Sequence, residues 1–302
     1  MTTRNAQHAH LPPPARPRCF AADRAWRAVP GTRNTQYGSG IACCFLLLLL
    51  LAACTETPQV TRPPVHLRVA DAAEHANVLE RLITTYTHDH DWVTITVDPM
   101  PAETAIEQVH QSQIDLAVLP TAPDQNSDKV WVSGWAYDSL AIIVNAANPA
   151  SNVSLAQLRD LFQGRTFDWT PFGGSGDVIP VSREAAAQAR VLFEERVMGN
   201  RAVTLNAVLE SSARDVIDFV ARTPTAIGYV SISQVDARVK VLNIEGILPD
   251  ATSSASGQYV LSTPNYLVAQ SEPQGDLRDF VIWLLSNDGQ SQLSQMGLGR
   301  VR

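Results

Sequence analysis

Cysteine and lysine are both scarce in this chain of 302 residues, and each scarcity excludes a class of protein. The lysines are Lys129 and Lys240, and without a basic stripe the chain lacks the electrostatic footprint of a nucleic-acid-binding protein. The four cysteines all lie early in the chain, at Cys19, Cys43, Cys44 and Cys54. The sequence after Cys54 therefore holds no disulfide framework and no CxxC metal site.

The most hydrophobic stretch is too short to cross a membrane. It covers residues 41–53 and has 13 residues, whereas a membrane-spanning helix needs about 20. A signal peptide needs an apolar stretch of about 7 to 15 residues that ends in small residues. Leu51, Ala52 and Ala53 meet that need, so the stretch is predicted to be an export signal. The alternative is a buried helix in which Cys54 is merely a small apolar side chain.

The four residues Leu51-Ala52-Ala53-Cys54 resemble the bacterial lipobox. The resemblance implies that Cys54 is lipidated on sulfur, becomes the first residue of the mature protein and anchors it to the membrane. Residues 1–53 are then an N-terminal extension with a signal peptide, and the polar, proline-rich residues 54–64 favour a flexible tether. Because the extension is longer than an ordinary signal n-region, Val29 is an alternative start of translation.

The part of the chain that would remain after cleavage is acidic and long enough for two lobes. Six of the 23 basic residues and one of the 30 acidic residues lie in residues 1–53, so the mature chain is acidic, with a net charge of −12. About 240 residues follow the tether, which is enough for one large α/β domain or for two lobes of about 120 residues each.

Patterns typical of strands and helices alternate after the tether. β-branched and apolar runs predict strands at residues 66–70, 93–97, 114–120, 139–149, 177–181 and 226–230. Apolar residues at helical spacing predict helices at residues 72–86, 102–111, 154–164, 184–197, 212–223 and from 276 onwards. Gly164 and Ser212 are predicted to end and to begin their helices. The alternation predicts an α/β fold with parallel strands and helices on the faces of the sheet.

Five segments resemble phosphate-type periplasmic solute-binding proteins of ABC transporters in order and spacing. They are VSLAQLRDLFQGRTFDW (153–169), IPVSRE (179–184), AIGYVSIS (226–233), EGILPDATSSASGQYVLSTPNYLV (245–268) and LRDFVIWLLSNDGQSQLSQMG (277–297). The resemblance implies an α/β, two-lobe, type II-like periplasmic binding protein fold whose lobes are joined by a strand hinge. We expect lobe 1 at residues 65–143 and 246–302 and lobe 2 as an insertion at 144–245, with chain crossings near 141–145 and 240–245.

The same resemblance implies where a ligand would bind. Proteins of this type hold an oxyanion between the lobes with backbone N–H groups, hydroxyl groups and an arginine. The ligand-binding positions that this implies are Asp71, Ala72, Ala73, Thr121, Ser182, Arg183 and Ala186. Arg183 would anchor a carboxylate, a sulfate-like group or an organic phosphate. The alternative is a salt bridge from Arg183 to Glu184 or to another surface acid.

Several positions depart from the pattern of that family. Alanines at residues 185–187 stand where small hydroxyl residues are usual, the loop at 69–77 lacks glycine and serine, and residues 120–121 replace a serine–aspartate pair. Each lost hydroxyl donor to a charged ligand removes about 1.5–3 kcal/mol, so we expect weak phosphate binding. Asp71 or Asp115 could take the place of that aspartate and accept a hydrogen bond from a protonated phosphate oxygen.

Other candidate sites have simpler interpretations. The histidines and aspartates of residues 88–92 favour a solvated loop over a metal site, and the glycines of residues 172–177 favour a turn over a phosphate loop. His75 is expected to be exposed at the start of a helix, with ligand contact as the alternative. Ser182 and Ser211 have no matching histidine and acid, so the sequence predicts no enzyme, no cofactor and no metal site.

These expectations combine into one function and one alternative. The chain is expected to be a lipid-anchored, extracytoplasmic solute-binding protein that closes around a small ligand, such as an oxyanion, and presents it to an ABC permease. The alternative is a binding fold that has lost transport and serves as an envelope sensor or interaction module. The expected partners are a small molecule, the permease and, through Cys54, the membrane; nucleic acid is not among them.

Overall fold

The computed structural model describes residues 62–124 and 129–301. The predicted signal peptide, the lipidation site at Cys54 and most of the tether lie outside the described residues. Within these two ranges, no helix is long and apolar enough to cross a lipid bilayer.

Most strands belong to one large mixed sheet. Its strands are β1 (Val65–Asp71), β2 (Val93–Pro99), β3 (Leu116–Leu119), β4 (Trp131–Asn145), β6 (Ile179–Arg183), β7 (Val208–Glu210), β8 (Ala226–Ser231), β9 (Val239–Val241), β11 (Ser262–Ala269) and β12 (Gly299–Arg300). The spatial order is β2-β1-β3-β11-β4-β8-β6-β7, and β9 and β12 also pair with β4. The short strands β5 (Asn152–Val153) and β10 (Asn243–Ile244) form a separate parallel pair.

Helices cover the sheet and its connections. They are α2 (Ala76–His88), α3 (Ala102–His110), α5 (Leu155–Gln163), α6 (Gln188–Phe193), α7 (Ala213–Arg222), α8 (Ala251–Ala255), α9 (Gly275–Leu285) and α10 (Asn287–Gln295). Short helical turns also occur at Thr170–Phe172 and Ile232–Gln234, and a π-helical turn at Glu194–Met198 follows α6.

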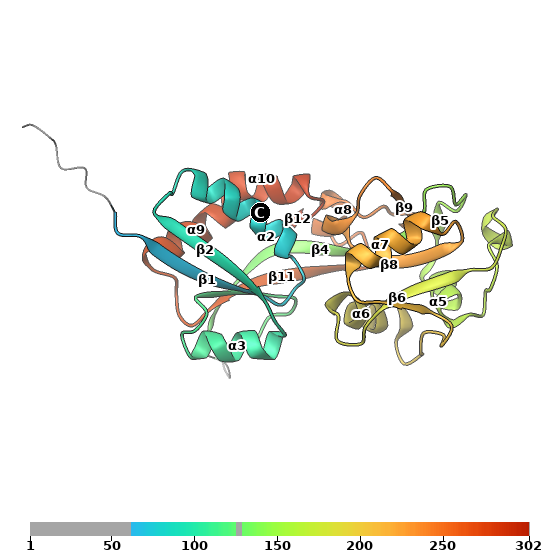
Figure 1. Cartoon of the computed structure of the whole chain (residues 1–302), viewed down its shortest axis with the longest axis horizontal. Coiled ribbons are helices and arrows are strands. Elements are labelled where there is room, and N and C mark those ends of the chain that lie inside the picture. The colour runs from blue at the N-terminus through green and yellow to red at the C-terminus, as the bar shows by residue number, and fades with distance from the viewer. Residues whose placement is uncertain (1–61, 125–128, 302) are drawn as a thin grey trace, which may run out of the picture. The chain divides into compact units, whose positions relative to one another are not determined.

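Strand β4 links the two halves of the sheet (Figure 1). Its first part pairs antiparallel with β11, from Trp131 opposite Ala269 to Ser139 opposite Ser262. Its second part pairs antiparallel with β8, beginning with Leu140 opposite Ser231. We call the half around β1, β2, β3 and β11 the first lobe and the half around β6, β7 and β8 the second lobe. One continuous strand therefore connects the lobes.

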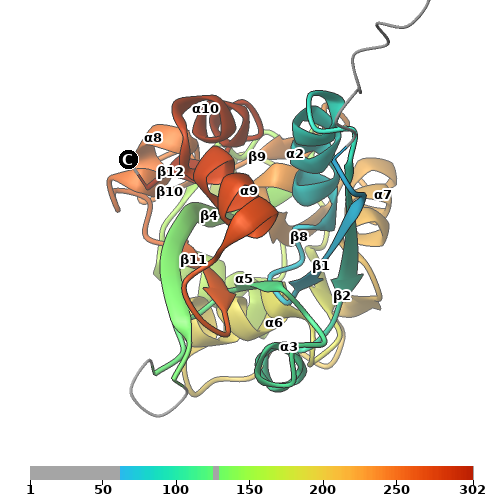
Figure 2. The same ribbon diagram turned by 90° about the vertical axis from the view of Figure 1, so that its left-hand side faces the viewer.

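Each lobe has apolar cores on both faces of its sheet. In the second lobe, Leu140, Ile142 and Val144 pack with α5 and α6, whereas Ala141 and Ile143 pack with α7. This alternation follows from the two-residue period of a strand. In the first lobe, α2, α9 and α10 pack on one face and α3 packs on the other, as Figure 2 shows.

The core residues also bear on the extent of the lobes. The second-lobe cores contain residues between 140 and 261, including Tyr259 and Leu261. The first-lobe cores contain residues up to Ala136 and from Leu267 onwards. The borders expected from the sequence, at 143/144 and 245/246, stay predictions.

Most predicted elements are confirmed, but two predicted helix starts are wrong. The helices expected from residues 72 and 184 begin at Ala76 and Gln188. The intervening residues form bends and turns, in which Glu74 has a left-handed φ of 59° and the Ala187 amide donates to the Glu184 carbonyl. Because apolar and small residues continue through both turns, the sequence pattern does not mark where the helices begin.

The two predicted end signals are confirmed. Gly164 ends α5 in the left-handed conformation with a φ of 72°, which glycine adopts without steric cost. Ser212 precedes α7, and its hydroxyl accepts a hydrogen bond from the Asp215 amide at 3.1 Å. Strand β7 runs parallel to β6 and ends just before α7 begins. Helix α7 therefore starts beside the end of β6, where the candidate site lies.

Candidate functional site

A groove of about 760 Å³ lies between the lobes. The first lobe contributes Asp71, Glu74, Ala76, Asn77 and Pro99, and the second lobe contributes Arg183, Ser212, Ala213, Arg214, Ile217, Ser233, Gln234, Asp236 and Arg238. Its volume is in the range typical of small-molecule sites. Three arginines and three acids line it, so a ligand in the groove would meet both signs of charge.

Arg183 is buried at the end of β6, with 6% of its surface exposed. Its Nη1 lies 3.3 Å from Glu74 Oε2, and its Nη2 donates to the Ser211 carbonyl at 3.2 Å. Its Nε is buried and donates to no group among the described residues. Arg183 thus forms a salt bridge, as one interpretation of the sequence allowed, but its partner is Glu74 of the other lobe and not the neighbouring Glu184.

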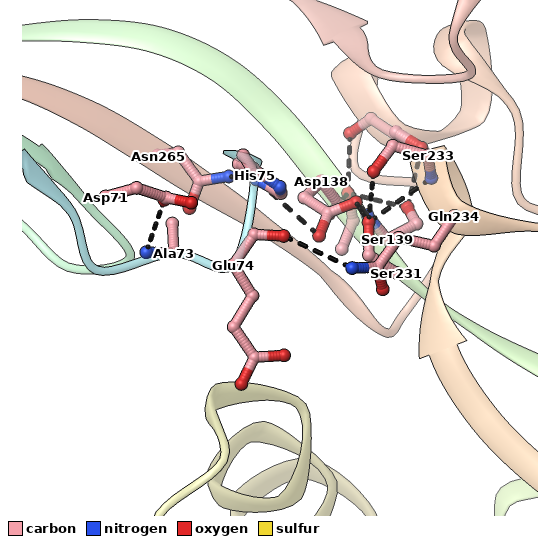
Figure 3. A network of polar contacts seen from close by, with 12 residues as sticks. Asp71, Ala73, Glu74, His75, Asp138, Ser139, Ser231, Ser233, Gln234 and Asn265 are labelled. Carbon is pink, nitrogen blue, oxygen red and sulfur yellow. Dashed lines mark hydrogen bonds and ion pairs between the residues drawn. The ribbon is translucent and has the colours of Figure 1, made fainter. Parts of the chain in front are cut away.

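Glu74 joins the lobes through both its side chain and its backbone. Its Oε1 accepts the Gln188 amide at 2.9 Å, and its backbone carbonyl accepts Gln234 Nε2 at 3.3 Å. Figure 3 shows the Glu74 carboxylate extending away from His75 and Asp138, toward α6. Nothing in the sequence identified Glu74, because its partners lie more than 100 residues away in the chain.

Asp71 lies at the end of β1, on the first-lobe side of the groove. Its Oδ1 accepts the Ala73 amide at 3.0 Å, whereas its Oδ2 is buried and accepts no hydrogen bond from the described residues. Burial raises the pKa of the Asp71 carboxyl above its ordinary value. Asp115, the other acid that we considered as a proton acceptor, is instead paired with Arg68 at 3.3 Å and does not line the groove.

The backbone amides of the first-lobe loop are already in use. The Ala72 amide donates to the Val118 carbonyl at 3.0 Å, and the Ala73 amide donates to Asp71. Both residues remain near the groove, since Asp71 and Glu74 on either side of them line it. As the loop stands, its alanines offer a ligand neither a hydroxyl group nor a free N–H.

The other sequence-predicted positions lie apart from the groove. The Ser182 hydroxyl is fully buried, 2.6 Å from the Tyr229 hydroxyl, and accepts from Arg190. Burial raises the pKa of Tyr229, so its hydroxyl stays protonated and can donate in this network. Thr121 and Ala186 are exposed, and neither lines the groove. The structure therefore brings together Asp71 and Arg183 of the predicted set, with Ala72 and Ala73 beside them.

A second, much smaller pocket lies beside Glu74. It has a volume of about 20 Å³, which is room for about one water molecule. Both lobes line it, with Ala73, Glu74, Pro120, Asp138, Leu140, Gln188, Ala189, Leu192, Ser231, Thr263 and Asn265. In this arrangement of the lobes, it has no space for an oxyanion.

A buried polar cluster surrounds Asp138, which sequence reasoning missed (Figure 3). Asp138 Oδ1 accepts from the Ser231 hydroxyl at 2.8 Å and from the Ser139 amide at 2.7 Å, and its Oδ2 lies 3.8 Å from His75 Nε2. Burial raises the pKa of Asp138, and the nearby imidazole opposes that rise. A lone charged residue inside an apolar strand was the signal that could have revealed it.

His75 is fully buried, so the expectation that it is exposed was wrong. Its Nε2 lies 2.7 Å from Asn265 Nδ2, and its ring packs against Trp135. The loop that follows β1 brings the histidine against two paired strands, where its ring meets Asn265 of β11 and Trp135 of β4 rather than solvent. His75 therefore joins first-lobe elements and does not line the groove.

The remaining motifs have structural roles. Residues 172–177 form the predicted turn before β6, with Gly173 and Gly176 at left-handed φ. In residues 88–92, the His90 ring stacks on Tyr86, and its Nδ1 lies 2.8 Å from the Tyr86 carbonyl. Among residues 62–124 and 129–301, no three histidine, cysteine or acidic side chains are grouped as metal ligands would be.

Comparison with known proteins agrees with this architecture. The family model described as PBP superfamily domain matches residues 56–288. The phosphate-binding protein PstS of Bacillus subtilis (strain 168) is 28% identical over 156 residues, which cover 51% of this chain and 52% of that protein. The phosphate-binding protein PstS 2 of Streptococcus agalactiae serotype V is 32% identical over 92 residues, covering 30% and 31%. The matched part is thus about half the length of the first relative and a third of the second.

Solved structures share the fold over most of this chain. A protein from Clostridium perfringens, solved with bound phosphate, has a TM-score of 0.70 at 22% identity and covers 78% of this chain and 100% of its own. An ABC-type phosphate transport receptor from Vibrio cholerae has a TM-score of 0.63 at 24% identity and covers 77% and 99%. The curated relatives are named as binding proteins, in agreement with the expectation that this chain is not an enzyme. By its fold and by the family model that spans residues 56–288, this chain belongs to the family of the PBP superfamily domain.

Proposed function

We propose that this chain is a lipid-anchored, extracytoplasmic solute-binding protein of an ABC importer, which binds a small anionic ligand in the groove between its lobes. The observation that carries the proposal is Arg183, a buried arginine on the second-lobe side of a groove that both lobes line. A guanidinium in that position can donate in parallel to a carboxylate or to a phosphate-like group. The names of the relatives support a phosphate-like ligand.

The two lobes offer complementary groups to such a ligand. Arg183 supplies a positive charge and an unused Nε donor, and Asp71 supplies an unused, buried carboxylate oxygen. A protonated oxyanion or a hydroxylated organic anion could accept from Arg183 and donate to Asp71. The groove is also larger than inorganic phosphate needs, which favours an organic phosphate or carboxylate as the solute.

The hydrogen bonds missing from the loops favour weak binding of inorganic phosphate. The Ala72 and Ala73 amides and the Ser182 hydroxyl are engaged within the protein. Each absent donor to a charged ligand removes about 1.5–3 kcal/mol, and a micromolar affinity amounts to only about 8 kcal/mol. Arg183 and Asp71 are therefore proposed as the main ligand contacts.

Thermal unfolding with candidate ligands tests the proposed solute class. The chain from Thr55 onward is heated with phosphate, sulfate, molybdate, organic phosphates or carboxylates, each at millimolar concentration. A ligand at a thousandfold excess over its dissociation constant stabilises by about 4 kcal/mol, which raises the midpoint by several degrees. A shift with an organic anion that is lost in Arg183→Gln would support the site. No shift with any anion would favour the envelope sensor or interaction module.

The membrane anchor is tested separately. We expect Cys54→Ala to release the protein from the membrane fraction, because a lipid attached at Cys54 is proposed to hold it there. If Cys54→Ala stays in the membrane fraction, the proposed lipid anchor is wrong. A permease and an ATPase encoded beside this chain would favour transport, whereas an adjacent sensor kinase would favour signalling.

A further inference from the structure

The Glu74 carboxylate occupies the place that an anionic ligand would take at Arg183. Its Oε2 meets Arg183 Nη1 at 3.3 Å, and its Oε1 accepts the Gln188 amide at 2.9 Å. An arginine and a backbone N–H are the kinds of donor that bind an oxyanion. A first-lobe side chain thus makes the contacts in the second lobe that a bound anion would be expected to make.

The backbone of Glu74 is held in an uncommon conformation while it makes these contacts. A φ of 59° is disfavoured for a residue with a side chain, and it persists only where the surroundings hold it. Here the second lobe holds the residue at both ends, through Arg183 and Gln188 at the carboxylate and through Gln234 at the backbone carbonyl. The loop conformation and the contact between lobes therefore depend on each other.

Glu74 also excludes a second anion from the same position. Although Arg183 lines the groove, only 6% of its surface is exposed while Glu74 is in place, and the pocket on the other side of Glu74 holds about one water molecule. Two negative groups that share one guanidinium would also repel each other at this distance. An external anion can make full contact with Arg183 after the Glu74 side chain has left.

We propose that Glu74 is an internal ligand of the second lobe, which holds the lobes together without a solute and sets the specificity of the site by competing with external anions for Arg183. The proposal rests on the function proposed above, because it concerns the same arginine. The apparent affinity for an anion is then reduced by the fraction of molecules from which Glu74 has withdrawn. Only solutes that offset the loss of the Glu74 contacts would bind tightly.

Calorimetric titration of the full chain in detergent with inorganic phosphate tests the competition. Glu74→Gln keeps the size of the side chain but removes its charge. In Glu74→Asn the side chain is too short to reach Arg183. Asparagine tolerates a left-handed φ, so the loop of this variant should still fold. We expect both variants to bind phosphate about tenfold to hundredfold more tightly than the wild type, because an interaction with a charged group no longer competes.

Glu184→Gln is the matched control. Glu184 is an exposed acid next to Arg183 in the sequence, and its removal changes the net charge by the same amount. We expect Glu184→Gln to change phosphate affinity by less than twofold. If it raises the affinity as much as the Glu74 variants do, the gain comes from general charge and the internal-ligand proposal is wrong.

Hydrogen exchange of residues 184–190, measured by mass spectrometry without any ligand, provides a second readout. The Gln188 amide donates to Glu74, so exchange in this segment should become at least severalfold faster in Glu74→Asn and should slow again with phosphate. If exchange in this segment is the same in Glu74→Asn as in the wild type, and the wild type binds phosphate at micromolar concentration, the internal-ligand proposal is wrong and the proposed function stands. Faster exchange with no phosphate or carboxylate binding in any variant would support the contact between lobes and overturn the proposed function.

Discussion

Asp71 is a buried carboxyl group with one oxygen that has no partner among the described residues. Asp115, by contrast, forms a salt bridge with Arg68. The difference could not be predicted from the sequence, in which both acids lie at ends of predicted strands. It depends on the packing of β1 between β2 and β3, which removes Asp71 from water. The ionised form of Asp71 is therefore the less favourable one in the folded protein.

The raised pKa of Asp71 predicts a pH effect on stability. The folded protein holds this proton more tightly than the unfolded chain, whose carboxyl has its ordinary value of 3.8. Protonation of Asp71 therefore stabilises the fold fully below pH 3.8, and the effect is lost as the pH rises through the folded-state pKa. Asp71→Asn has no such group. Its free energy of unfolding, relative to the wild type, should therefore rise between pH 4 and pH 7, as the wild type loses this contribution.

Urea unfolding of both proteins at steps of pH measures this difference. Asp138 also has a raised pKa, but it titrates in both proteins and cancels from the comparison. Curves that stay parallel from pH 4 to pH 7 would mean that the Asp71 charge is met by water or by a bound ion, and would weaken its proposed role as a ligand acceptor.

The elements that sequence periodicity predicted are those with a clean apolar pattern. Strand β8 and helix α5 match their predicted ranges closely, because their buried residues follow the periods of a strand and a helix. Strand β11 contains Pro264, which argues against a strand, and α10 has a polar sequence with Gly289, so neither was predicted. Long-range pairing with β4 and packing against α9 form these elements. Such contacts leave no mark on the local pattern.

Two glycines in the central strands provide a matched test of the packing of these elements. A Cβ added at Gly228 in β8 would lie 2.8 Å from Val216 Cγ1 of α7, whereas one at Gly134 in β4 would lie 3.6 Å from Val301 Cγ1. Gly228→Ala should therefore lower the free energy of unfolding by about 1–3 kcal/mol through overpacking. Gly134→Ala should change it by less than about 0.5 kcal/mol. Chemical denaturation measures both, and equal losses would contradict the tight contact between α7 and β8.

The two-lobe architecture of the whole protein could be expected from the resemblance of several segments taken together. The contact that joins the lobes at Glu74 could not, because it depends on how the lobes are arranged in space. Fold-level similarity fixes which loops meet, and the side chains in those loops decide what they bind.

Arg183 lies on the groove as the resemblance implied. Ser182 is the residue before it on the same strand, and it faces the interior because successive side chains of a strand point to opposite faces.

Net charge predicts how an anion approaches the whole molecule. The chain after the predicted cleavage has a net charge of −12, while the charges that line the groove balance and Arg238 is paired with Asp218 and Asp236. The long-range field should therefore repel phosphate, and salt should screen that repulsion, because the Debye length falls from about 30 Å at 0.01 M to about 8 Å at 0.15 M.

We expect the association rate constant for phosphate, measured by stopped-flow tryptophan fluorescence on Glu74→Asn, to rise severalfold as potassium chloride increases from 0.01 to 0.15 M. The dissociation rate constant should change less, since contacts within the groove set it and are screened less than exposed charges. An association rate that falls with salt would show instead that Arg183 and Arg214 attract the anion over a longer range than the acidic surface repels it, and that the groove itself steers the ligand.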